Sequence, residues 1–311
     1  MTVLALTGGV GGAKLALGLA HVMSPEDVVF LVNTGDDFEH FGLHISPDVD
    51  TLVYTLADQV NTETGWGRTD ETWSFESSMK RLGGDTWFRL GDKDLATHVY
   101  RSSLLSTGST LTEATQEIAH SFQIEHQVLP MSDDPVRTMV STNEGVLPFQ
   151  DYFVRRRCEP TVSAIEYQGG AVARLNLELD LESVSKVILC PSNPYLSIDP
   201  LLSISELAEF LQGTSVPVVA VSPIVKGLAL KGPTAKMMRE LGIQPSATTV
   251  ASHYRDLISG FVLDQEDAEH SAEICRMGLR TAEFQTIMRT FDDRVQLARD
   301  VLGFCETLSN D

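Results

Sequence analysis

Four carboxylates stand close together in the sequence, directly after a predicted strand over residues 28–32. They are Asp36, Asp37, Asp48 and Asp50, and together they span 15 residues. Mg²⁺ prefers oxygen ligands, and substrate phosphates commonly complete its coordination. This group of side chains therefore predicts a metal site that holds a diphosphate, with Asp37, Asp48 and Asp50 as the candidate ligands.

Two other interpretations of the same residues stay open. Asp36 follows Gly12 by 24 residues. Dinucleotide-binding folds place their ribose-binding acid near this position, so the spacing also fits a nicotinamide enzyme. Asp50 precedes an expected helix over residues 51–57, and aspartate is a preferred helix N-cap. Capping does not exclude a ligand role for the same carboxylate.

A glycine-rich turn near the N-terminus predicts a phosphate site. An aliphatic strand over residues 3–6 runs into four glycines, and a helical pattern follows at once: Gly8, Gly9, Gly11 and Gly12. The free N–H groups and the positive dipole end of such a helix attract phosphate. The segment is not a Walker A loop, because no Ser or Thr follows Lys14, and it departs from G-x-G-x-x-G. We expect the four glycines and Lys14 to contact a nucleotide or another phosphate ester.

Polar loops also follow other predicted strands. Residues 190–197 contain Ser192 and Asn193, whose side chains can bind a base edge or a phosphate. Residues 129–138 contain Ser132 and Asp133, for which an Asx-type turn before proline is the alternative. Ligands of open α/β sheets lie beyond the carboxyl ends of the strands. We therefore expect these loops to face one crevice.

The segment 89–98 groups charged residues that could contact a substrate. It contains Asp92, Lys93, Asp94 and His98. We expect the Lys93 ammonium to bind a phosphate or another substrate oxygen. The alternative is a helix start, where acidic residues are favoured by the positive end of the dipole. His98 is more typical of a structural hydrogen-bonding residue than of a general base.

The elements that must position these loops predict an α/β fold. Short apolar strands over residues 28–32, 127–129, 187–190 and 218–221 alternate with helical patterns, which favours a Rossmann-like, mostly parallel sheet with flanking helices. Three segments with more alternation are expected to form an antiparallel edge: 136–142, 151–155 and 171–177.

The domain boundaries follow from where these patterns change. Residues 1–60 and 123–250 are expected to form the nucleotide-binding core. Residues 61–122 contain all three tryptophans and predict a mainly helical insertion or cap. Residues 251–311 predict a helical segment packed on the core, because apolar residues recur at helical spacing.

Composition narrows the class of protein. The chain has 311 residues and a formal net charge of −20, which argues against binding to nucleic acid or to an anionic membrane. The four cysteines have no metal-site spacing, and such usage fits a reducing compartment. With neither a signal-peptide pattern nor an apolar run of membrane-spanning length, we expect a cytoplasmic protein.

Taken together, the motifs resemble those of the CofD-type 2-phospho-L-lactate transferases. The matching segments follow the family's order from residue 7 to about residue 238: TGGVGGAK, VNTGDDF, ISPDVDT, LGDKDLATH, LPMSDDPV, FQDYFV, PSNPYLSI, VAVSPIV and GPTAKMM. The PMSDDP and LGDKD segments are the most specific of these. The resemblance covers most of the chain.

The resemblance implies a transferase of coenzyme F-420 biosynthesis that depends on Mg²⁺. The ribityl hydroxyl of 7,8-didemethyl-8-hydroxy-5-deazariboflavin would attack a guanosine-diphosphate-linked phospho-acid donor (2-phospholactyl, phosphoenolpyruvyl or phosphoglyceryl), and GMP would leave. Asp50 and Lys93 match the positions that contact the deazaflavin acceptor, and Asp50 is the candidate catalytic residue. We expect the guanosine and phosphate contacts at Ser132, Asp133, Ser192 and Asn193, and a homodimer.

Two other classes remain as alternatives. The YvcK-like regulators share the glycine-rich opening and bind nucleotide-sugars, which would give nucleotide binding without turnover. An NAD(P)-binding oxidoreductase would explain the glycine turn and Asp36. It gives no role to the LPMSDDP and LGDKD segments.

Overall fold

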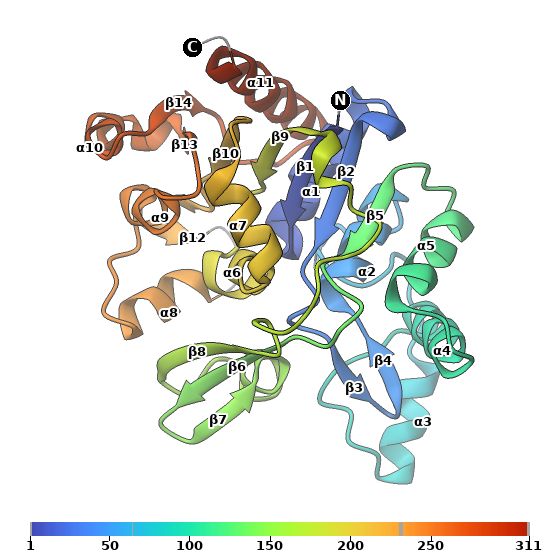
Figure 1. Cartoon of the computed structure of the whole chain (residues 1–311). Helices are drawn as coiled ribbons and strands as arrows, with labels where there is room; N and C mark the ends of the chain where they lie inside the picture. Colours follow the sequence, from blue (N-terminus) through green and yellow to red (C-terminus); the bar gives the residue numbers. More distant parts are fainter. Residues whose placement is uncertain (1, 64, 230–232, 310–311) are drawn as a thin grey trace.

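A computed structural model describes residues 2–63, 65–229 and 233–309. Its centre is a seven-stranded, all-parallel sheet with the order β5-β2-β1-β9-β10-β13-β14 (Figure 1). Numbered along the chain, these strands lie in the order 3-2-1-4-5-6-7, which is the Rossmann arrangement. The predicted fold class is confirmed. The strands are β1 (Thr2–Thr7), β2 (Val28–Val32), β5 (Gln127–Pro130), β9 (Val184–Leu189), β10 (Val218–Val221), β13 (Gly260–Asp264) and β14 (Arg280–Phe284).

Helices cover both faces of this sheet because alternate strand residues point to opposite sides. Leu4 and Leu6 of β1 pack with one set of helices, and Val3 and Ala5 pack with the other. The first set is α6 (Asp199–Leu202), α7 (Ser205–Gly213), α9 (Ala247–Tyr254) and α10 (Ser271–Arg276). The second is α1 (Gly9–Val22), α2 (Pro47–Leu56), α5 (Leu111–Ser121) and α11 (Phe291–Ser309). Burial on both faces explains why the inner strands read as continuous apolar runs.

The connection from β2 to β5 is long and carries most of the residues predicted to form the insertion. It starts with a hairpin of β3 (Phe38–His40) and β4 (Leu43–Ile45) and continues through α2. Residues 61–122 contain three helices, α3 (Ser74–Leu82), α4 (Asp92–Ser106) and α5. The prediction that the whole segment is an insertion or cap is wrong for α5, which packs on the central sheet. Figure 1 shows the hairpin and α3 at the end of the central sheet opposite the N-terminus, which is where β1 ends.

A separate antiparallel sheet of three strands lies at the same end of the molecule (Figure 1). It consists of β6 (Arg137–Thr142), β7 (Gly145–Pro148) and β8 (Val162–Gln168). Of the three segments predicted to form an antiparallel edge, 136–142 is confirmed as a strand. The prediction is wrong for 151–155, where Asp151–Arg155 is a π-helical turn, and for 171–177, which contains turns and no strand. Tyr152 lies in that turn and is fully buried. A turn can therefore bury this apolar residue as a strand would, which is why the sequence pattern resembled a strand.

The prediction of a helical segment over residues 251–311 is wrong in part, because two strands of the central sheet lie there. β13 is buried throughout, whereas β14 is the edge strand and has the polar sequence Arg-Thr-Ala-Glu-Phe. An edge strand exposes one side to water, so its composition does not stand out from the helices around it. The helical prediction holds for α9, α10 and α11.

The remaining elements are short. They are a hairpin of β11 (Ile224–Val225) and β12 (Leu228–Ala229), the helix α8 (Thr234–Glu240), the π-helical turn Pro194–Ile198, and the 3-10 turns Pro25–Asp27, Leu181–Ser183 and Gln265–His270. Gly232 of the GPTAKMM motif lies outside the described residues.

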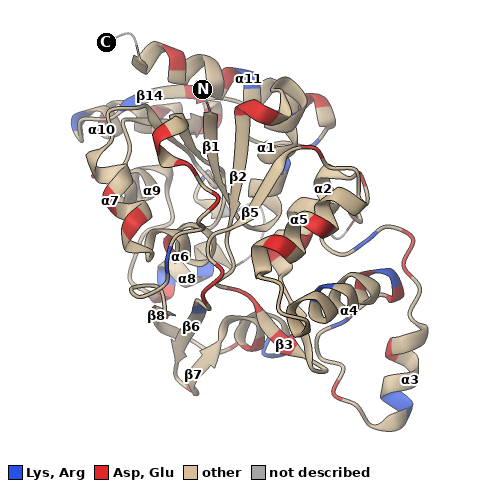
Figure 2. Ribbon diagram, turned by 45° about the vertical axis from the view of Figure 1, so that its right-hand side comes forward, with Lys and Arg blue, Asp and Glu red and all other residues tan. Residues whose placement is uncertain are grey.

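The surface is acidic. Figure 2 shows Asp and Glu spread over α5, α7 and α11, in keeping with the net charge of −20. Within the described ranges, no helix combines the length and the apolar character needed to cross a membrane.

Candidate active site

Three of the predicted loops meet where β1, β2 and β9 end. β1 lies between the other two strands, and the chain order reverses direction at β1 and β9, which is the ligand-binding point of this fold. Gly8 follows β1, Asn33 follows β2 and Ser192 follows β9. The Gly8 N–H donates to Ser192 Oγ at 3.3 Å, so the loops of β1 and β9 are in direct contact.

The glycine turn is tight because neighbouring groups occupy the space of a side chain. Helix α1 starts at Gly9, which has a φ of +65°. A Cβ at Gly8 would lie 2.6 Å from Asp48 Oδ2, and a Cβ at Gly11 would overlap the carbonyl oxygen of Pro191. A Cβ at Gly12 would overlap Thr7 Oγ1. Close packing thus accounts for three of the four glycines.

We expect Gly11→Ala to destabilise the fold. The new methyl group would collide with a backbone carbonyl that cannot rotate away, and overpacking of this kind costs about 1–3 kcal/mol. Thermal or urea unfolding measures the change. Gly303→Ala is the matched control, because a methyl group added at Gly303, inside α11, would meet no described atom within 4 Å other than the adjacent backbone of its own helix. There alanine should stabilise by about 0.5–1 kcal/mol. Equal stability of the two variants would contradict the packing explanation.

The N-terminus of α1 faces a carboxylate of the protein itself. Asp48 Oδ2 accepts from Asn33 Nδ2 at 2.9 Å, and the Gly9 N–H also donates to the Asp48 carboxylate. Asn33 Nδ2 donates in addition to the carbonyl of Leu196. Asn33 and Asp48 therefore connect the glycine turn to the loops that follow β2 and β9.

Asp36, Asp37 and Asp48 form a buried acidic cluster beside this turn. Their residues are 6%, 2% and 7% exposed. Burial, and next the charge of Asp48, raises the pKa of Asp36 well above its ordinary value. Burial, reinforced by the charge of Asp37, raises the pKa of Asp48 to about 6. Three neighbouring carboxylates in a buried site would gain from a neutralising cation.

The cluster offers free ligand atoms for such a cation. Asp37 Oδ2 accepts from Ser46 Oγ at 2.8 Å and lies 3.0 Å from His44 Nε2. Asp36 Oδ1 and Asp37 Oδ1 are buried and have no hydrogen-bond partner among the described residues. The described part of the chain contains no complete set of three metal-ligating side chains. Mg²⁺ usually takes one or two carboxylates and completes its shell with water and substrate phosphates, so two free carboxylate oxygens suit it.

Asp50 pairs with a buried arginine. It is 3% exposed, and Arg101 is fully buried. Arg101 Nη1 donates to Asp50 Oδ2 at 3.0 Å, and Nη2 donates to Asp50 Oδ1. Asp50 is not the N-cap of its helix, because α2 starts at Pro47, four residues earlier than expected. Each carboxylate oxygen keeps a further lone pair for a ligand.

Lys93 lies on the first turn of α4, next to the helix that carries Asp50. Its Nζ donates to the carbonyl of Thr69 at 3.1 Å, and its backbone N–H donates to Glu71. The neighbouring Asp94 accepts from Tyr54 Oη at 2.8 Å. Tyr54 and Asp50 are both on α2. The contact between Tyr54 and Asp94 therefore holds the first turn of α4, which carries Lys93, next to α2.

The other predicted contact residues occupy different positions. Ser192 lies against the glycine turn, but Asn193 uses its side-chain carbonyl to cap the turn Pro194–Ile198. Lys14 Nζ donates to the carbonyl of Met288 at 2.9 Å. Ser132 and Asp133 follow the edge strand β5: Ser132 Oγ donates to the carbonyl of Arg174, and Asp133 accepts from the backbone and the hydroxyl of Thr112. These two residues thus bind other segments of the protein, two strands from β1.

Arg101 and Asn33 belong to the site but were not predicted from the sequence. Asp94, His98 and Arg101 are spaced i, i+4 and i+7, which places them on one face of α4. This spacing could have predicted from the sequence that Arg101 lies beside Asp94. For Asn33 the sequence offered only its position as the first residue after a predicted strand. Nothing local, however, indicates that Arg101 pairs with an aspartate 51 residues earlier.

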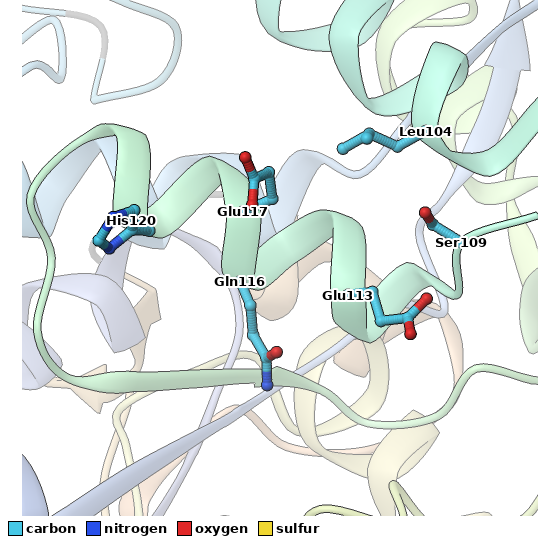
Figure 3. Close-up of a pocket in the computed structure, with 6 residues that line it drawn as sticks. All are labelled: Leu104, Ser109, Glu113, Gln116, Glu117 and His120. Atoms are coloured by element: carbon cyan, nitrogen blue, oxygen red, sulfur yellow. The ribbon is translucent and has the colours of Figure 1, made fainter. Parts of the chain in front are cut away.

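A shallow surface pocket lies elsewhere, between α4 and α5 (Figure 3). It is lined by Leu104, Ser109, Glu113, Gln116, Glu117 and His120. Glu113 is committed to the capping box of α5, and Glu117 accepts from Tyr100. None of the predicted site residues lines this pocket, so we place the site at the strand ends instead.

Comparisons with known proteins agree with the motif-based resemblance. The model of the family "2-phospho-L-lactate transferase CofD" matches residues 3–288. A 2-phospho-L-lactate transferase of Methanosarcina acetivorans is 37% identical over 306 residues, which are 97% of this chain and 99% of the relative. A phosphoenolpyruvate transferase of Kitasatospora aureofaciens is 35% identical and covers 98% of each chain.

Among solved structures, a protein of the UPF0052 family from Bacillus halodurans is similar in fold. The TM-score is 0.61 at 13% sequence identity, with 97% of this chain and 98% of the other covered. At this identity the similarity shows the fold alone. It is the Rossmann-like arrangement that the two chains share.

Proposed function

This chain belongs to the CofD family and is an enzyme of the 2-phospho-L-lactate transferase type, and from this premise we propose the reaction that it catalyses. The acceptor is the deazaflavin 7,8-didemethyl-8-hydroxy-5-deazariboflavin, and the product is a precursor of coenzyme F-420. Its ribityl hydroxyl attacks the phosphorus that carries the acid in a guanosine-diphosphate-linked donor. A new P–O bond forms, the bond to GMP breaks, and the hydroxyl proton is lost.

The family match over residues 3–288 carries this proposal. The geometry supports it, because a phosphoryl transfer needs mainly positioning and neutralisation of charge. The loops at the ends of β1, β2 and β9 supply the N-terminus of α1 and the Ser192 hydroxyl for a diphosphate, with Asp36, Asp37 and Asp48 beside them.

We assign Asp50 to the acceptor hydroxyl. Its carboxylate accepts a hydrogen bond from that hydroxyl through a lone pair that Arg101 does not use, orients the oxygen toward phosphorus and takes up its proton as the new bond forms. General base assistance of this kind contributes about 10²–10⁴-fold in rate. Lys93 holds another part of the same acceptor, because two N–H donors remain after its bond to Thr69.

We assign the metal to the acidic cluster. Asp37, through its free Oδ1, and Asp48 would hold Mg²⁺, with the free Oδ1 of Asp36 beside them. The carboxylate of Asp50 balances the charge of Arg101. When bound there, Mg²⁺ neutralises charge on the diphosphate and stabilises the leaving phosphate. The glycine turn and Ser192, which lie beside this cluster, would orient the donor.

We expect Lys93→Ala to raise the KM for the deazaflavin about 10- to 100-fold, since a hydrogen bond from a charged group contributes about 1.5–3 kcal/mol. kcat should change much less, because the residue binds substrate away from the reacting atoms. Steady-state kinetics with a saturating donor measures both. Lys80→Ala is the control, a lysine of the neighbouring helix α3 that pairs with Glu76. An unchanged KM in Lys93→Ala would remove this residue from the acceptor site.

The experiment that tests the proposed function offers the purified protein all three donors separately. Each reaction contains Mg²⁺ and the deazaflavin, and GMP and the phosphodiester are quantified by mass spectrometry. The relatives carry two different names, so the donor that gives stoichiometric GMP and phosphodiester identifies the acid. Nucleotide binding without product from any donor would contradict the proposal and favour a regulator.

A further inference from the structure

We propose that Arg101 is a positioning residue for the transfer reaction: it holds the Asp50 carboxylate in one orientation and links it to the helix that carries Lys93. The inference rests on the proposed function, because it assumes that Asp50 and Lys93 contact the acceptor. It concerns a residue that touches neither substrate directly and acts through Asp50.

The ion pair between Arg101 and Asp50 is a two-point contact. Arg101 is fully buried and Asp50 is 3% exposed, and the two guanidinium nitrogens Nη1 and Nη2 reach different oxygens of the carboxylate. A two-point contact between planar groups fixes both the direction and the rotation of the carboxylate. A single hydrogen bond would leave the Asp50 side chain free to turn about its last torsion.

The Arg101 guanidinium makes few hydrogen bonds besides those to Asp50. Its hydrogen-bond partners within the described ranges are Asp50 and His98, and its Nε has none. An arginine has five donors, so one that only joins segments of a fold can bridge several carbonyl groups. Burial of a charge is costly unless a partner offsets it. Here Asp50 is that partner.

A chain of contacts lies behind the pair. His98 Nδ1 lies 3.4 Å from Arg101 Nη1 and 3.6 Å from Asp50 Oδ2, and its Nε2 lies 3.2 Å from Asp94 Oδ2. The other oxygen of Asp94 accepts from Tyr54 Oη. Asp94, His98 and Arg101 share one face of α4, and Asp50 and Tyr54 share one face of α2.

This network joins the two proposed acceptor contacts into one unit. Lys93 is adjacent to Asp94 at the start of α4, and Arg101 lies two turns later on the same helix. Any movement of α4 relative to α2 would displace Lys93 and rotate Asp50 together. Arg101 therefore sets the distance between the group that binds the acceptor and the group that orients its hydroxyl.

The test replaces the two-point contact by a one-point contact. Arg101→Lys keeps the positive charge but cannot bind both oxygens in the same plane. With the donor saturating, we expect kcat to fall about 10²-fold, as for a misplaced reacting group, and the KM for the deazaflavin to rise. The KM for the donor should not change. Arg294→Lys, a partly buried arginine of α11, is the matched control and should keep wild-type kinetics.

A double substitution separates positioning from a merely structural role. If Arg101 acts through Asp50, Arg101→Lys has little further effect on kcat in an Asp50→Asn background. A structural contribution would lower activity by the same factor in both backgrounds, and this result would overturn the inference. Wild-type kinetics in Arg101→Lys would overturn it as well, with the proposed function intact. Failure of the wild-type enzyme to form product with any donor would overturn both.

Discussion

Asp50→Asn should lower turnover by about 10²–10⁴-fold, the range for loss of a general base. The amide has nearly the same shape, so it can still accept one hydrogen bond from Arg101, but it can neither orient the acceptor hydroxyl as strongly nor take its proton. The KM for the donor should stay near its wild-type value. Single-turnover measurement of GMP release reports the chemical step directly.

The matched control for this variant is Asp264→Asn. Asp264 is 1% exposed and lies at the end of β13, three strands from β1, where it accepts from Glu266 and Thr286. Asp264→Asn removes the same charge from a buried carboxylate, so it should destabilise the fold. Turnover per folded molecule should stay within about twofold of the wild-type value. Thermal unfolding of both variants gives the fraction of folded protein, by which the turnover is then divided. Near-normal turnover in Asp50→Asn would remove Asp50 from the mechanism.

The second large effect is expected from the acidic cluster. Removal of divalent cations with a chelator should abolish turnover, and added Mg²⁺ should restore it, because the cation supplies several kcal/mol of transition-state stabilisation. In Asp48→Asn the Mg²⁺ concentration for half-maximal activity should rise about 10-fold or more, since one charged ligand is lost. Isothermal titration calorimetry of Mg²⁺ binding to the GDP-bound protein measures the loss of Mg²⁺ affinity without turnover.

Asp267→Asn serves as the control for the magnesium titration. Asp267 is also buried, and both of its oxygens accept from the backbone N–H of Lys226. Its Mg²⁺ dependence should equal that of the wild type. If Asp48→Asn gave the same half-maximal concentration as the wild type, the metal would have to bind outside the cluster of Asp36, Asp37 and Asp48.

Much of the core was predictable because its signals are local. The strand over residues 3–6, the glycines and the following helical pattern are contiguous, and the structure contains β1, the turn at Gly8 and α1 in that order. β2 and β10 are also buried apolar runs, and β5 and β9 each end in one. β14 was not predictable in this way, since an edge strand with a polar sequence resembles a helix face or a loop.

The glycine turn shows how one pattern can have more than one physical cause. Four glycines predicted close approach to a phosphate, and in the structure protein atoms come close to them. Asp48 faces the start of α1, and the carbonyl of Pro191 occupies the space beside Gly11. Only the packing of three loops decides which atoms fill those positions.

The sequence by itself determined the residue types, the order of the motifs and the loops in which the candidate site residues lie. The tertiary structure alone decided which neighbours each of the four carboxylates has. Asp36, Asp37 and Asp48 share one buried cluster, and Asp50 turns to Arg101, 51 residues later in the chain. The reason is physical, because distance and burial in space decide which charged groups pair. Neither the distance nor the burial can be inferred from sequence spacing when a long connection, such as that between β2 and β5, separates the two residues.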